Sequence, residues 1–144
     1  MLGILTALLS GALMSVQGVF NTGLTKQTSL WVSTGWVQIS AFLVCVAAWL
    51  FTGKSKISAL AQVDHKYLLL GGVIGAFITV TVIQSMSALG PAKSAMLIVI
   101  AQLAVAYMIE LMGLFGVEKA DFQWRKVIGM AIAIAGIIIF KWEK

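Results

Sequence analysis

The sequence predicts an all-α integral membrane protein of five hydrophobic spans, with almost no soluble domain. Of its 144 residues, 60% are hydrophobic and only 10% are charged, and long apolar runs recur between short polar segments. A bilayer core of roughly 30 Å needs about 20 apolar residues per helix, so this length holds about five spans. The runs are too long and too uniformly apolar for barrel strands, and helices satisfy every backbone polar group within the segment.

The first predicted span covers about residues 3–24. Small residues follow one another at a strict four-residue spacing, which places them on one side of a helix: Gly3, Ala7, Gly11 and Ser15. Another backbone can approach closely on such a side, so we expect it to face protein.

The second and third spans are predicted at about residues 30–52 and 67–89. Trp31 and Trp49 lie near the two ends of the second span, where an aromatic belt is expected at the membrane interface.

A single proline, Pro91, separates the third span from the fourth, which is predicted at about residues 92–115. Proline is favoured at the start of a helix because its missing N–H needs no partner there. The fifth span is predicted at about residues 124–141. Its apolar run is short, but Trp124 and Trp142 bracket it and add interfacial length.

The basic residues lie between or just beyond the apolar runs, so we interpret the net charge of +5 as interfacial anchoring and not as nucleic-acid binding. The N-terminal side would carry Lys54, Lys56, Lys66, Lys119, Arg125 and Lys126, and the other side Lys26, Lys93, Lys141 and Lys144. This small excess favours a cytoplasmic N-terminus but leaves insertion in both orientations open. A chain with an odd number of spans that inserts both ways can assemble, from two copies, the inverted repeat found in many transporters.

Glu110 is the one acidic residue within the predicted spans, whose basic residues lie only at their ends. A charged group at membrane depth costs roughly 2.5 to 3.5 kcal/mol on insertion scales, and by default it marks a functional site. Two interpretations stay open. Glu110 lines an aqueous cavity, or it reaches the headgroups or a neighbouring helix.

Amide side chains are spread over four of the five predicted spans: Gln17 and Asn21 in the first, Gln38 in the second, Gln84 in the third and Gln102 in the fourth. Gln17 and Asn21 are four residues apart and share a helix face, as do Gln102 and Glu110 at a spacing of eight. Together they predict a polar cavity for a small-molecule substrate. The alternative for each amide is an interhelical hydrogen bond worth about 0.6 kcal/mol.

Trp36, several residues inside the second span, is a candidate for stacking on a flat or cationic substrate, although contact with lipid or a packed helix explains it more simply. The chain has no metal-ligand spacing, nucleotide fingerprint or nucleophile with an acid and base partner. We therefore expect no enzyme activity, no cofactor and no nucleic-acid partner.

Several segments resemble a known family: SGALMSVQGVFNTGLTK, GGVIGAFITVTVIQSMSALGPAKSAMLIVIAQL, IELMGLFG and RKVIGMAIAIAGIIIF. Together they are similar to the short, five-span members of the drug/metabolite transporter superfamily, the DUF606 or YdcZ-like group of bacterial membrane proteins. The resemblance implies one half of a ten-helix, inverted-repeat transporter in the bacterial inner membrane. The small multidrug resistance branch differs, because it has an essential acidic residue in its first span, where this chain offers Gln17.

We therefore expect an alternating-access transporter, working as an antiparallel homodimer or as a heterodimer with a related chain, with Glu110 coupling protons or recognising substrate charge. The first and fourth spans run in opposite directions, so only an inverted partner brings Glu110 to the depth of Gln17 and Asn21. Two alternatives remain: a facilitator without ion coupling, and a structural or accessory subunit that packs against a partner protein.

Overall fold

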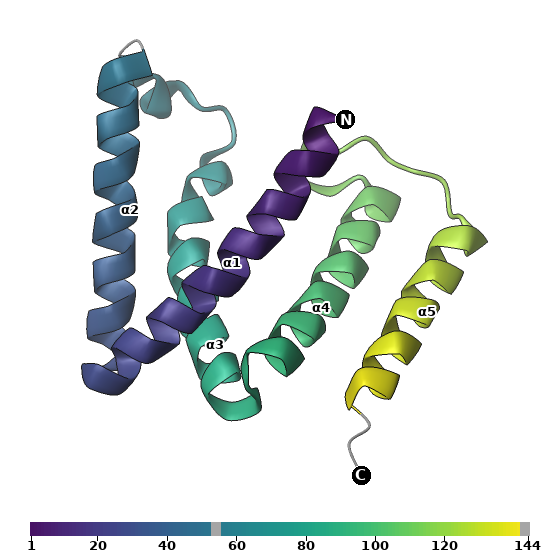
Figure 1. Ribbon diagram of the computed structural model, residues 1–144. Helices are drawn as coiled ribbons and strands as arrows, with labels where there is room; N and C mark the ends of the chain where they lie inside the picture. The colour runs from purple at the N-terminus through teal and green to yellow at the C-terminus, as the bar shows by residue number, and fades with distance from the viewer. Residues whose placement is uncertain (53–55, 142–144) are drawn as a thin grey trace. The chain divides into compact units, whose positions relative to one another are not determined.

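The computed structural model describes residues 1–52 and 56–141, and all regular structure in these ranges is helical (Figure 1). The helices are α1 (Leu2–Gln27), α2 (Leu30–Thr52), α3 (Gly71–Leu89), α4 (Pro91–Met112) and α5 (Trp124–Lys141), with short 3-10 helices η1 (Ile57–Gln62), η2 (Lys66–Leu70) and η3 (Leu114–Gly116). The predicted anchors Lys54, Trp142 and Lys144 lie outside the described residues. The chain divides into two compact units, Met1–Ala88 and Leu89–Lys144. The prediction of an all-helical membrane protein is confirmed.

Within the described ranges, four helical segments are long and apolar enough to cross a membrane: Leu2–Gln27, Leu30–Thr52, Lys66–Leu89 and Pro91–Met112. Helix α5 is not among them, because its 18 residues include Arg125, Lys126 and Lys141. At 1.5 Å of rise per residue, α5 is roughly 27 Å long, close to the thickness of a bilayer core. A fifth span at α5 therefore stays a prediction.

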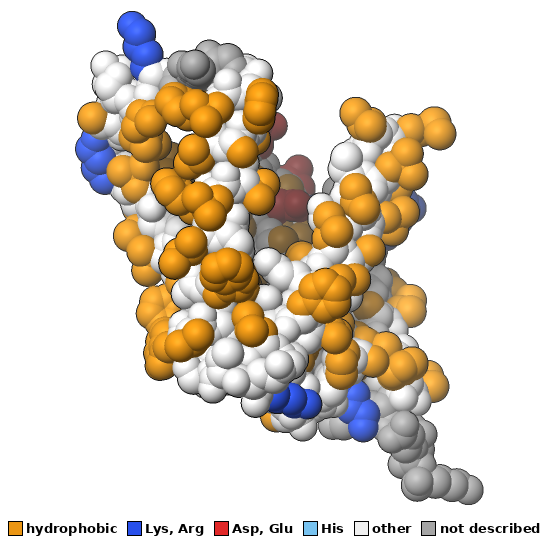
Figure 2. Space-filling model, turned by 60° about the vertical axis from the view of Figure 1, so that its left-hand side comes forward, with side chains coloured by type: hydrophobic (Ala, Val, Ile, Leu, Met, Phe, Trp, Pro, Cys, Tyr) orange, Lys and Arg blue, Asp and Glu red, His pale blue; other side chains and the backbone are white. Residues whose placement is uncertain are grey.

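Large apolar side chains cover the outer surfaces of the helices. Phe51 is 90% exposed, and Leu8, Phe42 and Ile132 are also more than half exposed. Figure 2 shows apolar side chains spread over the visible helix surfaces, with few Lys and Arg side chains among them. Such a surface is incompatible with water but matches lipid tails, which are as apolar as leucine.

In the first unit, α1 and α2 meet at a tight corner. The buried Ser33 hydroxyl, at the start of α2, donates a hydrogen bond to the backbone oxygen of Asn21 at 3.1 Å. One turn earlier on α1, Gly18 lies against α3, where an added Cβ would be 2.5 Å from the Sδ and Cε atoms of the buried Met86. Gly18 therefore permits the close approach of α1 and α3.

Within the first unit, no described residue covers the small-residue side of α1. Gly3, Ala7, Gly11 and Ser15 are all exposed, and nothing lies within 4 Å of a Cβ built on Gly3 or Gly11. The predicted protein neighbour for this side therefore does not come from the first unit itself.

Four hydroxyl side chains of α1 are satisfied locally. Thr6, Ser10, Ser15 and Thr22 each donate a hydrogen bond to a backbone oxygen in the preceding turn. This arrangement lets a hydroxyl lie in an apolar helix without needing a tertiary partner. Thr25, near the end of α1, and Thr34 on α2 are different, because their hydroxyls are buried and have no hydrogen-bond partner within the described ranges.

In the second unit, backbone conformations set both ends of α4. Gly90 precedes Pro91 with φ 81° and ψ 161°, a region accessible essentially only to glycine. The apolar sequence continues to Phe115, but α4 ends at Met112 because Gly113 takes the left-handed conformation, with φ 64° and ψ 36°. Glu110 therefore lies in the last turn of α4.

Candidate functional site

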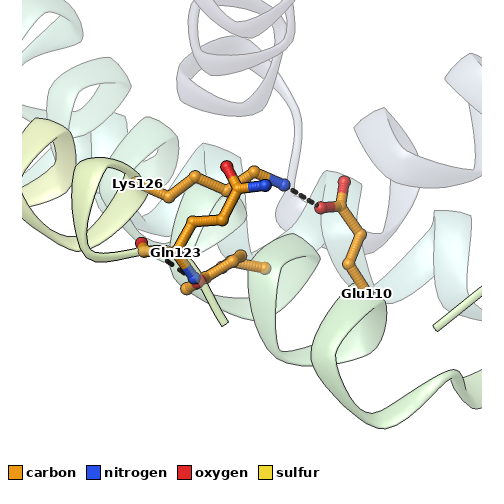
Figure 3. Close-up of polar contacts among 4 residues, drawn as sticks. Glu110, Gln123 and Lys126 are labelled. Carbon is orange, nitrogen blue, oxygen red and sulfur yellow. Dashed lines mark hydrogen bonds and ion pairs between the residues drawn. The ribbon is translucent and has the colours of Figure 1, made fainter. Parts of the chain in front are cut away.

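The candidate site centres on an ion pair between α4 and α5. The Lys126 ammonium, in the first turn of α5, lies 2.6 Å from the Oε2 atom of Glu110 (Figure 3). The side chains of Lys126 and Glu110 are 42% and 44% exposed. A pair this open to its surroundings contributes little to stability, about 1 kcal/mol at most. Its interest lies in the pairing of opposite charges at the ends of two apolar helices.

Each charge is unfavourable for its own helix. A carboxylate near the C-terminus of α4 meets the negative end of that helix dipole, and a cation near the N-terminus of α5 meets a positive end. The contact between Lys126 and Glu110 offsets both unfavourable charge–dipole interactions, because each side chain supplies the charge that the other helix end favours. The ion pair therefore ties the end of α4 to the start of α5.

Tyr107, one turn before Glu110, holds the segment that leads into α5. Its buried hydroxyl accepts a hydrogen bond from the Gln123 backbone N–H at 2.9 Å and lies 3.4 Å from the Gln123 backbone oxygen. The centre of the same ring is 5.2 Å from the Lys126 ammonium, within the range of a cation–π interaction. Tyr107 thus positions α5 and also contributes an aromatic face to the site.

The return loop after α4 packs back onto the helix end. The Ala120 backbone N–H donates to the Glu110 backbone oxygen at 2.9 Å. Phe122 extends the contact, with ring centres 6.5 Å from Tyr107 and 5.3 Å from Trp124. Because the backbone of Glu110 is held by the loop while its carboxylate is held by Lys126, both ends of this residue are tied to the segment that follows α4.

A groove of about 320 Å³ runs between the two helices. It is lined by Leu103, Ala106, Tyr107, Glu110, Lys126, Gly129 and Met130. Its walls are apolar, and its polar groups are the carboxylate, the ammonium and the tyrosine ring face. This composition suits a small organic molecule that carries one charged group. Within the described ranges, no three or more His, Cys, Asp or Glu side chains are grouped as a metal site would need.

The predicted pair Gln17 and Asn21 lies in a second, wider groove on α1. Its volume is about 540 Å³, and all the residues that line it belong to α1. Asn21 is buried and Gln17 is exposed. Because one helix supplies every wall, this groove is open.

The remaining predicted residues do not join the groove between α4 and α5. Gln102 shares a helix face with Glu110 by spacing, but it is exposed and is not part of the groove lining. Gln38 is half-buried on α2, Gln84 is exposed on α3, and Trp36 is 61% exposed. The structure therefore groups Glu110 with two residues that the sequence analysis did not single out for the site, Tyr107 and Lys126.

The glutamine side chains share one property. In the part of the chain that the structure describes, the amides of Gln17, Gln38, Gln84 and Gln102 make no hydrogen bond. They are not used as links between helices of one chain, in contrast to the locally bonded hydroxyls of α1.

The sequence could have indicated Tyr107 as a site residue, but not Lys126. Tyr107 lies three residues before Glu110, so helical spacing alone places the two on neighbouring positions of one face. Lys126 is 16 residues away in sequence, and it resembles any interfacial lysine. Only the path of the return loop shows that this lysine, and not its neighbour Arg125, contacts the carboxylate.

Comparison with known proteins gives one family match. Residues 2–139 match the family described as "Putative inner membrane exporter, YdcZ". No curated protein and no solved structure matches the chain. The match extends over both compact units and includes all of α1 to α4 and most of α5.

Proposed function

Because the chain belongs to the YdcZ family of inner membrane exporters, we propose that it moves a small organic molecule out across that membrane by alternating access. The substrate would enter a polar path enclosed by two copies of the chain. Glu110 would recognise the charge of the substrate or carry the proton that is exchanged for it.

The unpaired glutamine amides are the observation that supports this proposal most. One such amide lies on each of the helices α1 to α4, in segments that are otherwise apolar. An amide transferred to hydrocarbon without a hydrogen bond costs several kcal/mol. Groups outside each compact unit must therefore meet these amides, and a transport path lined by two copies would supply water, substrate and a second chain as partners.

An antiparallel dimer is the assembly that this chain favours. Within the first unit, the small-residue side of α1 is uncovered, and the groove containing Gln17 and Asn21 lacks a second wall. If α1 and α4 both span the membrane, Asn21 lies towards one face and Glu110 towards the other. An inverted second copy places its Glu110 carboxylate at the depth of the Gln17 and Asn21 amides, where both can contact one substrate.

Export by living cells tests the transport function. Metabolites released into the medium would be compared between cells that express the wild type, Glu110→Gln or the matched control Glu118→Gln, whose carboxylate lies in the return loop and outside the groove. We expect a released compound with the wild type and the control, and its loss with Glu110→Gln. Equal release by all three proteins would remove Glu110 from the mechanism.

Coupling is tested separately in proteoliposomes loaded with the released compound. A pH-sensitive dye inside the vesicles reports whether protons move as the compound leaves. A facilitator without ion coupling would transport the compound with no pH change, and Glu110 would then serve only to recognise charge.

Cross-linking tests the antiparallel arrangement. In a Cys45→Ala background, cysteines at Asn21 and Met112 share a depth only between inverted copies, so oxidation should give covalent dimers. The matched control pair, Gly3→Cys with Met112→Cys, shares a depth only within one copy or between parallel copies. Dimers from the control pair alone would refute the inverted arrangement.

A structural or accessory role is the alternative that one observation favours. Glu110 already has Lys126 as a partner in the same chain, as expected if its purpose is to join α4 to α5. A protein of this kind would release no metabolite on expression, and its thermal stability would not respond to a metabolite panel.

A further inference from the structure

The Lys126 ammonium is surrounded by the groups that recognise an organic amine. The Glu110 carboxylate is 2.6 Å from it, and the centre of the Tyr107 ring is 5.2 Å away. Carboxylates and aromatic faces both attract ammonium groups, the first by charge and the second through the ring quadrupole. The walls beyond them are apolar, from Leu103 and Met130 among others.

Lys126 can leave this position without disturbing the packing of the helices. Its side chain is 42% exposed, and the ammonium sits on a flexible four-carbon stem. The Tyr107 hydroxyl holds the start of α5 through the Gln123 backbone, so the helix stays in place when the lysine moves.

Exchange of one ammonium for another also conserves the charge of the groove. A ligand amine that displaces Lys126 leaves Glu110 paired, and the released lysine is free to reach the surroundings. A ligand carboxylate, in contrast, would meet repulsion from Glu110 unless it took Lys126 as its own partner. The geometry therefore favours a cationic ligand, and it predicts opposite effects of the two charged residues.

We propose that the groove between α4 and α5 binds the ammonium group of a small primary amine, and that Lys126 occupies this position when no ligand is bound. The inference rests on the proposed function, since it names a substrate class for the same site. The apolar part of the amine would lie against Leu103, Ala106 and Met130. The groove volume of about 320 Å³ is at the small end of the usual range for ligand pockets, roughly 300 to 1,000 Å³.

Three probes of similar size and different charge test this inference. The full-length protein in lipid nanodiscs would be titrated calorimetrically with phenethylammonium, 3-phenylpropionate and 2-phenylethanol, with heats from empty nanodiscs subtracted. We expect saturable binding of phenethylammonium, and no saturable binding of the carboxylate or the alcohol.

Two substitutions then distinguish a lysine that occupies the position of the ligand from a lysine that binds the ligand. Lys126→Met removes the competing ammonium and keeps the stem, so the Kd of phenethylammonium should fall by about tenfold. Glu110→Gln should abolish its binding. The matched controls Arg125→Gln and Glu118→Gln alter charges outside the groove lining and should leave the Kd unchanged.

A third pair of variants tests the location without changing charge. Gly129 lines the groove, and nothing lies within 4 Å of a Cβ built there, so Gly129→Leu fills the space without meeting the backbone. Gly136, two turns further along α5, is equally open but lies outside the lining. Gly129→Leu should weaken phenethylammonium binding at least tenfold, whereas Gly136→Leu should not.

Several results would overturn the inference. They are binding of 3-phenylpropionate that Lys126→Met removes, an unchanged phenethylammonium Kd in Lys126→Met, and no binding of any probe by protein that elutes as a single folded species. None of them refutes export itself, because the release of metabolites and its loss in Glu110→Gln are measured independently in cells.

Discussion

Removal of the Tyr107 hydroxyl isolates the contact that holds the start of α5. In Tyr107→Phe the ring stays beneath the Lys126 ammonium, but the Gln123 N–H loses its acceptor at 2.9 Å. The second contact, at 3.4 Å, is long for an O–H···O hydrogen bond and adds little. A partly buried hydrogen bond of this kind contributes about 1 kcal/mol, and the freed N–H can find water as the loop opens.

Hydrogen–deuterium exchange is the assay that resolves this effect. A loss of about 1 kcal/mol in local opening free energy should speed exchange in the segment before α5 by about fivefold. Peptides from α1 and α2 serve as internal controls and should be unchanged. Unchanged exchange before α5, or equal acceleration in every helix, would show that the Tyr107 hydroxyl does not hold this loop.

Three further substitutions test the packing of the helices. Gly18→Ala requires the flexible end of the buried Met86 side chain to shift. It should therefore be less stable to heat, by about 1 kcal/mol, than the control Gly23→Ala, where an added Cβ meets nothing within 4 Å. Thr34→Val removes a buried hydroxyl that lacks a hydrogen-bond partner in the described chain, so it should raise the midpoint of thermal unfolding; a loss of export instead would show that the hydroxyl binds substrate. Gly90→Ala imposes a Cβ on a conformation with φ 81° and should cost about 1 to 3 kcal/mol, and a wild-type unfolding midpoint for this variant would contradict the strain argument.

The sequence was sufficient to place Glu110 but not to describe its surroundings. Its carboxylate stands out because the neighbouring residues are apolar, and this is a local property of one segment. Its partner, Lys126, lies 16 residues away in sequence. Lys119, Arg125 and Lys126 all follow α4 within a short distance, and composition treats them as equivalent interfacial charges. The return loop selects Lys126, through contacts of Ala120 with the Glu110 backbone and of Tyr107 with the Gln123 backbone.

The end of α4 likewise depends on tertiary packing that the local sequence does not reveal. The apolar run continues to Phe115, so it predicts a longer helix than the structure has. The helix stops at Met112 because Gly113 is left-handed and close to the loop, where a Cβ would lie 3.2 Å from the Cβ of Lys119. Glycine permits this conformation, but only the packing of the loop requires it.

Sequence alone determined the helical membrane class, because lipid as a solvent demands long apolar segments that satisfy their own backbone, and both properties are readable residue by residue. It also determined that polar amides and one carboxylate interrupt those segments. The tertiary structure decided which of these groups already have partners, since that depends on loop paths between distant residues. It paired Glu110 with Lys126 over the Tyr107 ring and left the glutamine amides without partners in the described chain.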